Sequence, residues 1–225
     1  MLVIFDCDGV LVDSEIISAE VNAALFREEG YEILAEEMNA RFAGLPGAEI
    51  FRLVEEELGR ALPATLRSRA DEEIDRRMAT VKALAGVHEL LDRLDDPRCI
   101  CSNSSSARLK LSLGAAGLYD RFKPYIFSAK EVGAGRQKPA PDVYLHAARE
   151  LETDPREAVV IEDSVHGVAG AVAAGMRVIG FTGGSHSWPG HADALTEAGA
   201  ETVVRRLTDA AAVIEAMKTW GGMEG

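Results

Sequence analysis

Six short apolar runs, separated by stretches of helical periodicity, set the strongest limit on what this chain can fold into. The runs occupy residues 2–5, 98–101, 126–127, 158–161, 177–181 and 201–204. Helical spacing is clear between two of them, where Val143, Ala147 and Leu151 recur after Pro141 at the expected start of a helix. Short strands that alternate with helices build a parallel sheet wrapped by helices. The sequence therefore predicts an α/β fold.

One long segment, residues 15–84, departs from this alternation and contains no convincing strand. A helical face recurs from Ile17 to Leu25, and the stretches 49–59 and 66–81 have the pattern of further helices. We therefore expect a small all-helical cap domain inserted after the first strand. The simpler alternative is that these helices flank the sheet like the others.

The insertion divides the chain into two predicted domains. Residues 1–14 and 85–225 form the core that holds the sheet, and residues 15–84 form the cap. Hinges are expected near residues 12–14 and 83–86, where the chain leaves the core and returns to it.

The charge balance narrows the classes of partner. The 225 residues carry a formal net charge of −13, which repels nucleic acids and anionic membrane surfaces. An anionic substrate would therefore need positive charge from the site itself. No run approaches about 18 apolar residues, and Met1 leads into the first strand without a basic flank. We expect a cytoplasmic protein without membrane association, either a monomer or a weak dimer.

Three cysteines, Cys7, Cys99 and Cys101, bear on redox chemistry. An odd and sparse count in a chain of this length does not suit a disulfide framework. Cys99 and Cys101 could supply half of a zinc site, but no second Cys or His pair has matching spacing, so buried strand thiols are expected. Cys7 lies between two carboxylates, which argue against a nucleophilic thiol because they raise its pKa.

Polar side chains follow four of the apolar runs, at the points where the predicted strands end. They are Asp6 and Asp8 after the first run, Ser102 and Asn103 after the second, Lys138 in the loop after the third, and Glu162 and Asp163 after the fourth. In open parallel sheets the ligand site lies beyond the carboxyl ends of the strands. We therefore expect these groups to converge on one crevice.

Four carboxylates against one lysine leave this crevice strongly negative, because two such charges about 4 Å apart repel by roughly 4 kcal/mol at an effective dielectric of about 20. Mg²⁺ binds carboxylates, water and phosphate oxygens and would compensate them. Asp6 and Asp163 are predicted to ligate it through their side chains, and Asp8 through its backbone carbonyl, with Gly9 easing the turn. Glu162 reaches the ion directly or through water.

The same inventory predicts phosphoryl transfer. Asp6 is free to attack phosphorus and form an aspartyl-phosphate, while Asp8 can protonate the leaving oxygen and later take a proton from water. Ser102 and the backbone N–H of Asn103 are expected to donate to the phosphoryl oxygens, and Lys138 supplies fixed positive charge. Each residue taken alone has a simpler interpretation: Ser102 could be a helix N-cap, and Lys138 could be a solvated surface lysine. Their conjunction after successive strands favours one site.

Together these motifs resemble those of the haloacid dehalogenase-like hydrolase superfamily. The shared features are DCDGVLVDS at the start, the strand ending in Ser102, the lysine of QKPAPD and the acidic pair of VVIEDSVHG. The inserted helices look like the small cap of its subfamily I, and the likeness spans nearly the whole chain. The resemblance implies a Rossmann-like core, Mg²⁺, Asp6 as the nucleophile and Asp8 as the acid/base.

The resemblance also bears on the substrate. Dehalogenases of the superfamily use no metal and lack the second aspartate, so Asp8 argues against dehalogenation. The chain looks most like sugar-phosphate phosphatases of the β-phosphoglucomutase-like branch. This likeness implies a phosphoric monoester hydrolase for small phosphorylated metabolites, sugar or sugar-acid phosphates, with 6-phosphogluconate among the candidates.

Two alternative functions stay open. A phosphomutase of the same branch is the enzyme alternative, although Gly47 stands at the place comparable to an arginine of the mutase cap. A phospho-receiver module, in which Asp6 holds a phosphoryl group as a signal, is the non-enzymatic alternative. The large cap and Asp8 favour completed chemistry on a small enclosed substrate instead.

Four arginines of the predicted cap are candidates for holding the part of the substrate that does not react. Arg41 is expected in a loop, and Arg69, Arg76 and Arg77 on a later helix. Each is also compatible with a solvated helix surface. His166 follows the acidic pair closely enough to line the site, although a helix-start histidine is the simpler interpretation.

Overall fold

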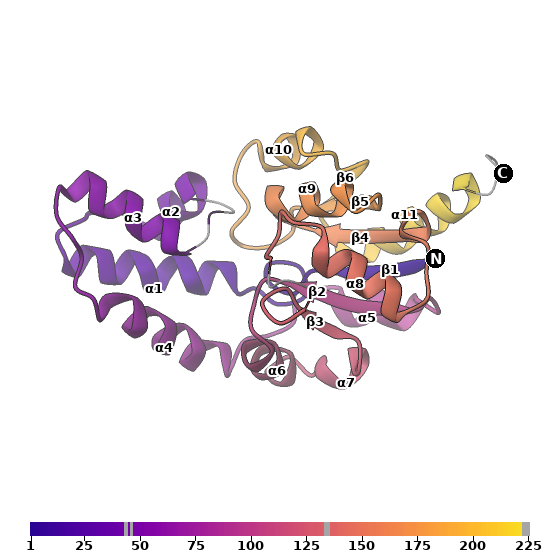
Figure 1. The fold of residues 1–225 in the computed structure, drawn as a ribbon, viewed down its shortest axis with the longest axis horizontal. Coiled ribbons are helices and arrows are strands. Elements are labelled where there is room, and N and C mark those ends of the chain that lie inside the picture. The colour runs from indigo at the N-terminus through magenta and orange to yellow at the C-terminus, as the bar shows by residue number, and fades with distance from the viewer. Residues whose placement is uncertain (43–44, 46, 133–135, 222–225) are drawn as a thin grey trace.

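The computed structural model describes residues 1–42, 45, 47–132 and 136–221 and contains a six-stranded sheet (Figure 1). Its strands are β1 (Leu2–Phe5), β2 (Arg98–Ser102), β3 (Ile126–Ser128), β4 (Ala158–Glu162), β5 (Arg177–Phe181) and β6 (Thr202–Val204). They coincide closely with the six apolar runs, and the four central strands, β2, β1, β4 and β5, are almost entirely buried. The predicted α/β fold is confirmed.

The strand order explains where a ligand site can form. The order is β3-β2-β1-β4-β5-β6, with every neighbouring pair of these strands parallel. Phe5 on β1 lies opposite Ile100 on one side and Ile161 on the other. After β1 the chain adds β2 and β3 on one side of it, and then β4, β5 and β6 on the other side. A crevice opens beyond the carboxyl ends of the strands at such a reversal.

Helices cover both faces of the sheet, because successive strand residues point to opposite sides. One face is covered by α5 (Val87–Arg93), α6 (Ser106–Ala115), α7 (Tyr119–Phe122) and α11 (Leu207–Gly221), and the other by α8 (Asp142–Glu150), α9 (Val165–Ala173) and α10 (His191–Glu197). A 3₁₀ turn, Pro155–Glu157, leads into β4. Cys99 and Cys101 are free thiols buried on the second face, as expected for structural cysteines.

Four more helices lie together beyond the carboxyl end of the sheet, at the left of Figure 1. They are α1 (Glu15–Glu28), α2 (Ala35–Phe42), α3 (Gly47–Leu58) and α4 (Leu66–Met78). Their apolar side chains pack on one another, as the ring of Phe26 does against Tyr31 and Phe51 with centroids 6.2 and 5.0 Å apart. The helices therefore stand over the end of the sheet and do not flank its faces.

The two connections between these helices and the sheet run side by side. Val12 forms an isolated antiparallel bridge with Ala83, and the N–H of Leu84 donates to the C=O of Leu11 at 2.9 Å. Both connections fall at the predicted hinges. We propose that α1–α4 form a cap that moves about this pair of segments.

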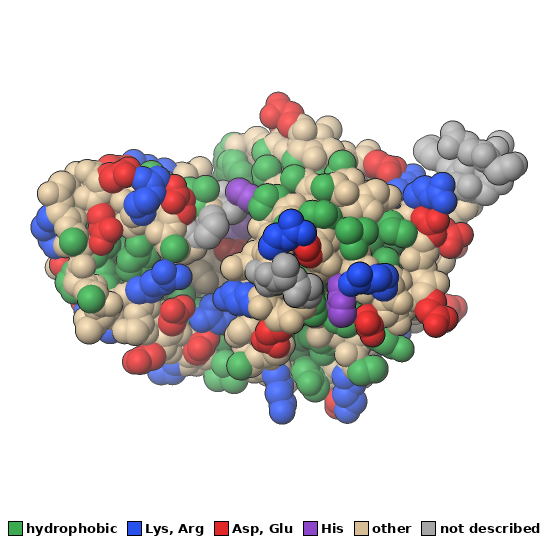
Figure 2. All heavy atoms as spheres, viewed as in Figure 1, with side chains coloured by type: hydrophobic (Ala, Val, Ile, Leu, Met, Phe, Trp, Pro, Cys, Tyr) green, Lys and Arg blue, Asp and Glu red, His purple; other side chains and the backbone are tan. Residues whose placement is uncertain are grey.

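Charged side chains of both signs are interspersed over the face shown in Figure 2. Many form ion pairs between helices, such as Arg121 of α7 with Asp92 of α5 at 2.7 Å. Exposed pairs of this kind add little stability, so the fold depends on its buried apolar clusters. No helix among the described residues combines the length and apolar character needed to cross a membrane.

Candidate active site

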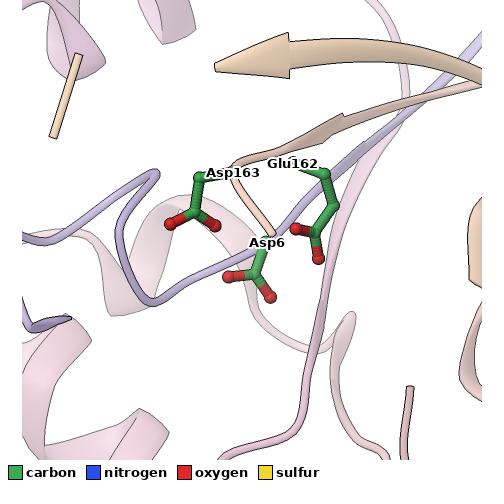
Figure 3. A group of neighbouring side chains, drawn as sticks. All are labelled: Asp6, Glu162 and Asp163. Carbon is green, nitrogen blue, oxygen red and sulfur yellow. The ribbon is translucent and has the colours of Figure 1, made fainter. Parts of the chain in front are cut away.

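Three buried carboxylates meet beyond the ends of β1 and β4. Asp6 follows β1, Glu162 ends β4 and Asp163 comes next, and Figure 3 shows their carboxyl groups gathered in one place. One oxygen from each lies within 4.8 Å of the others. The three residues are 7%, 0% and 5% exposed, in that order. The strand reversal thus brings together residues separated by more than half of the chain.

Lys138 places a positive charge inside this cluster. Its Nζ lies 2.5 Å from Asp6 Oδ1 and 2.6 Å from Glu162 Oε1, and its side chain is 3% exposed. Burial alone would lower the pKa of this ammonium group, but the two carboxylates overcome the effect and raise the pKa well above its usual value. Lys138 is therefore a fixed cation and not a solvated surface lysine.

One ammonium group does not neutralise three carboxylates. Burial raises the pKa of Asp6 well above its usual value, and the charges of Glu162 and Asp163 add to the effect while Lys138 opposes it. Burial likewise raises the pKa of Asp163. The excess of negative charge among hard oxygen atoms favours a divalent cation here.

The carboxylate of Glu162 lies among several protein donors. Its Oε1 accepts from Lys138 and, at 3.2 Å, from the hydroxyl of Tyr144, while Oε2 accepts from the backbone N–H and the hydroxyl of Ser164, each at 2.9 Å. A Cβ at Gly167 would lie 1.8 Å from Oε1, so glycine leaves the room for this carboxylate. Glu162 thus holds Lys138 in place, and whether it also ligates a metal stays a prediction.

Removing the charge of Lys138 should destabilise the fold. In Lys138→Met the carboxylates of Asp6 and Glu162 stay buried without a counter-charge, so we expect the free energy of unfolding in EDTA to fall by about 3 kcal/mol. Urea denaturation measures this difference. Lys130→Met is the control, because Lys130 is exposed at the same cavity and should change stability by less than about 0.5 kcal/mol. Equal stability of both variants would contradict the importance of the buried pair.

Asp8 lies beside the cluster, and three serine hydroxyl groups fix its carboxylate. Ser14 donates to Oδ1 at 2.8 Å, and Ser104 and Ser102 donate to Oδ2 at 2.7 and 3.3 Å. Ser14 precedes α1, yet its side chain makes no capping hydrogen bond to that helix. Its hydroxyl serves Asp8 instead. Asp8 is therefore held in one orientation at the edge of the cluster.

The end of β2 and the loop that follows it contain the two predicted residues, Ser102 and Asn103, and Ser104, which was not predicted. Asn103 joins this loop to the next, because its Oδ1 accepts from the backbone N–H of Lys138 at 2.9 Å. Ser105, and not Ser102, caps α6, so the simpler interpretation of Ser102 is wrong. Ser104 was missed because the run SNSSS does not single out one serine. Contacts of Ser102 and Asn103 with a phosphoryl group stay predictions.

A cavity of about 530 Å³ lies between this cluster and the helices α1–α4. Its polar or charged lining residues include Glu15, Ser18, Asn22, Asn39 and Arg67 from the helices, and Arg108, Lys130, His166, His186 and Trp188 from the sheet-bearing part. The volume suits a small metabolite.

The predicted cap arginines lie elsewhere. Arg41 belongs to α2 and not to a loop, and its guanidinium is held by Tyr31 and Glu57. It is not among the described residues that line the cavity, so the expected substrate contact of Arg41 has no support here. Arg69, Arg76 and Arg77 line a separate groove formed by α1 and α4. All four arginines form ion pairs with glutamates on nearby helix surfaces, and these pairs hold their side chains away from the cavity.

Two titratable residues near the cluster were not predicted. Glu15, the first residue of α1, is partly buried, and burial together with Asp8 and Asp163 raises its pKa to about 7. His186, in the loop after β5, has its Nε2 2.8 Å from Asp163 Oδ2. A search for polar residues after the fifth apolar run, residues 177–181, would have found His186. His166 lines the cavity, which was one of its two interpretations.

Known proteins share both the sequence pattern and the fold. Residues 3–181 match the family described as haloacid dehalogenase-like hydrolase. The 6-phosphogluconate phosphatase of Escherichia coli (strain K12) is 31% identical over 189 residues, which cover 83% of this chain and 85% of that protein.

Two solved structures extend the comparison. A conserved haloacid dehalogenase-like protein from Agrobacterium tumefaciens is 55% identical, with a TM-score of 0.92 and coverage of 96% of this chain and 98% of that one. A hydrolase of the same family from Deinococcus radiodurans R1, solved with bound phosphate and sodium, is 34% identical, with a TM-score of 0.83 and coverage of 96% of each chain. The resemblance drawn from the four motifs is confirmed: this chain belongs to the haloacid dehalogenase-like hydrolase family.

Proposed function

We propose that this chain is a Mg²⁺-dependent phosphatase that hydrolyses small phosphorylated metabolites, sugar or sugar-acid phosphates, through a phosphoaspartate formed on Asp6. One observation carries the proposal: Asp6 is buried within ion-pair distance of Lys138, beside Asp163, with Asp8 at the edge of the cluster. A nucleophile, a cation site, a fixed positive charge and an acid/base therefore share the floor of one cavity.

The donor set fits Mg²⁺. Asp6 and Asp163 offer hard oxygen atoms within 4.8 Å of each other, and the negative charge buried with them exceeds what Lys138 supplies. We assign the metal to these two side chains and the backbone carbonyl of Asp8, with Glu162 acting through Lys138. Bound there, Mg²⁺ supplies Lewis-acid stabilisation of the charge on the phosphoryl group.

The residues of the chain then account for two chemical steps. In the first, an oxygen of Asp6 attacks phosphorus, the bond from phosphorus to the leaving oxygen breaks, and protonated Asp8 gives its proton to that oxygen. In the second, ionised Asp8 takes a proton from water, the water oxygen attacks phosphorus, and the bond to Asp6 breaks to release inorganic phosphate. The three serines that hold Asp8 keep it at the cavity for both steps.

The cavity walls suit a hydroxylated substrate. Ser18, Asn22 and Asn39 present neutral polar groups, and Asn22 Oδ1 is buried without a hydrogen-bond partner among the described residues. Arg67 and Lys130 line the same cavity and form no ion pair with a described residue, so they could balance the carboxylate of a sugar acid. The name of the Escherichia coli relative, a 6-phosphogluconate phosphatase, supports this class.

Closure of the cap would exclude bulk water before phosphoryl transfer. Arg108 of α6 lines the cavity and pairs with two residues of α4, Asp75 at 2.7 Å and Asp71 at 3.3 Å. These ion pairs join the cap to the sheet-bearing part at the edge of the site. We propose that they favour the closed arrangement.

Release of inorganic phosphate from a panel of sugar and sugar-acid phosphates, measured with Mg²⁺ and with EDTA, tests the proposal. We expect release that requires Mg²⁺, because the buried carboxylates otherwise repel the substrate. Release should be fastest with polyhydroxylated monophosphates that fill the cavity. No release from any member of the panel, or equal release in EDTA, would overturn the proposed function.

The same panel separates the alternatives. A phosphomutase would isomerise a hexose phosphate in the presence of a bisphosphate activator and release little phosphate. A phospho-receiver would keep its phosphoryl group, so a long-lived phosphorylated form would indicate signalling. A cytoplasmic location and a monomeric or weakly dimeric state stay predictions, the second of which size-exclusion chromatography tests.

A further inference from the structure

The segment that runs from the end of β5 to the first residue of α10 carries two histidines that both contact Asp163. We call residues 184–191, with the sequence GSHSWPGH, the histidine loop. The chemical steps proposed above do not use it. Nevertheless His186 lines the same cavity as Asp6 and is 7% exposed.

The two histidines meet Asp163 at different atoms. His191 Nε2 lies 2.7 Å from the backbone oxygen of Asp163, and its Nδ1 lies 3.1 Å from the hydroxyl of Ser187. The ring of Trp188 stacks on His191 with the centroids 3.8 Å apart. His186 Nε2 lies 2.8 Å from the carboxylate oxygen Oδ2. One loop therefore fixes the backbone of Asp163 and reaches its side chain.

Two glycines allow this close approach. A Cβ at Gly9, where φ is 78°, would lie 2.0 Å from Asp163 Oδ2 and 2.9 Å from His186 Cε1. A Cβ at Gly184 would lie 2.6 Å from His186 Nδ1. The loop is also tied to the first motif, because the N–H of Ser185 donates to Asp13 Oδ1 at 3.1 Å. The ring of His186 is therefore confined beside the carboxylate.

The two ring nitrogens of His186 are not fully satisfied by hydrogen bonds. Both ring nitrogens are buried, and neither has a well-aligned hydrogen-bond partner among the described residues, although Nε2 lies 2.8 Å from Asp163 Oδ2. An unpaired buried polar group is costly. The terminal torsion of an aspartate is soft, so a rotation of Asp163 can bring its carboxylate into line with Nε2 of His186.

We propose that His186 is a positioning residue, which holds one carboxylate oxygen of Asp163 so that the other ligates Mg²⁺ together with Asp6. The inference rests on the Mg²⁺ site of the proposed function. A hydrogen-bond partner of a ligating carboxylate fixes its orientation, and loss of such partners weakens metal binding about 10- to 100-fold. His186 contacts the ligand and not the reacting phosphoryl group.

Mg²⁺ binding to the full chain, measured by isothermal titration calorimetry without substrate, tests this role. His186→Gln keeps an N–H donor near the position of Nε2, whereas the side chain in His186→Asn is too short to reach Asp163. We expect the Kd for Mg²⁺ to rise about tenfold or more in H186N and to stay within about threefold of wild type in H186Q. Saturating Mg²⁺ should return the kcat of H186N toward the wild-type value, because only metal occupancy is lost.

His88→Gln, at an exposed position on α5, is the matched control and should bind Mg²⁺ like the wild type. Thermal unfolding in EDTA shows which variants are folded. If both His186 variants are unfolded, Ser185→Ala is the substitute, because it removes the hydrogen bond from the Ser185 hydroxyl to the Asp13 carboxylate without touching Asp163. Unchanged Mg²⁺ affinity in that variant counts against the role.

Other outcomes are equally decisive. Equal Mg²⁺ affinities for folded H186N and H186Q would overturn the inference. So would a raised KM for a sugar phosphate with unchanged Mg²⁺ affinity, since His186 would then act on the substrate. A wild-type protein that binds Mg²⁺ but releases no phosphate overturns the proposed function alone, whereas one that does not bind Mg²⁺ overturns this inference as well.

Discussion

Replacing Asp6 with asparagine should lower kcat by at least about 10⁴-fold and leave the protein folded. The amide has nearly the shape of the carboxylate, and its oxygen can still accept a hydrogen bond from Lys138 Nζ, which lies 2.5 Å from Asp6 Oδ1. It does not act as a nucleophile toward phosphorus. The change also removes one charge from a site where burial raises the pKa of Asp6, so the Tm in EDTA should not fall.

Two measurements check this result. Phosphate release gives kcat, and acid quenching of a reaction with radiolabelled substrate shows whether the phosphoryl group becomes attached to the protein. The wild type should carry label and D6N none. Asp120→Asn is the control, because that aspartate side chain is 80% exposed on α7 and should turn over normally. Near-normal turnover or labelling of D6N would refute Asp6 as the nucleophile.

Replacing Asp8 with asparagine should lower the rate of the first step by about 10²- to 10⁴-fold when the leaving group is an alkyl alcohol. Such an oxygen leaves only with a proton, and an amide has no proton to give at neutral pH. The loss should be less than about tenfold with p-nitrophenyl phosphate, whose leaving group departs as a stable anion. Ser102, Ser104 and Ser14 still surround the side chain, so the geometry should persist.

Single-turnover release of the alcohol or phenol isolates this first step from hydrolysis of the phosphoaspartate. Sorbitol 6-phosphate and p-nitrophenyl phosphate provide the two leaving groups. Ser14→Ala is the companion variant, since it removes only the hydrogen bond to Asp8 Oδ1 and should cost about tenfold or less with either substrate. Equal losses in D8N for both leaving groups would show that Asp8 is not the acid.

The strands could be predicted because a central strand is buried on both faces, so its consecutive residues are nearly all apolar. All of β4, Ala158–Glu162, is buried, and its apolar part is an uninterrupted run in the sequence. Helix α8 could be predicted for a related reason, since Val143 and Ala147 recur on its buried face. In each case the signal is local, and the confirmed fold follows from it. The cap helices were predicted from the same periodicity, but whether they move as a unit is a proposal.

Site residues differ in how far the sequence could identify them. Asp6, Glu162 and Asp163 stand directly at strand ends, so their convergence follows once the sheet is known to be parallel. Arg41 does not follow a strand, so no such rule gives its position. The prediction that it lies in a loop was wrong, because α2 continues to Phe42. Ser14 and Ser104 meet at Asp8 from segments 90 residues apart, which no spacing rule anticipates.

The sheet, the helical insertion and the acids at the carboxyl ends of β1 and β4 could be inferred from the amino-acid sequence alone, because each depends on neighbours in the chain. The contact of Glu162 with Lys138, the three serines around Asp8 and the place of His186 against Asp163 emerged only from the folded chain. These pairings depend on the paths of loops between distant segments. A hydrogen bond selects partners by distance and direction in space, and periodicity along the chain encodes neither.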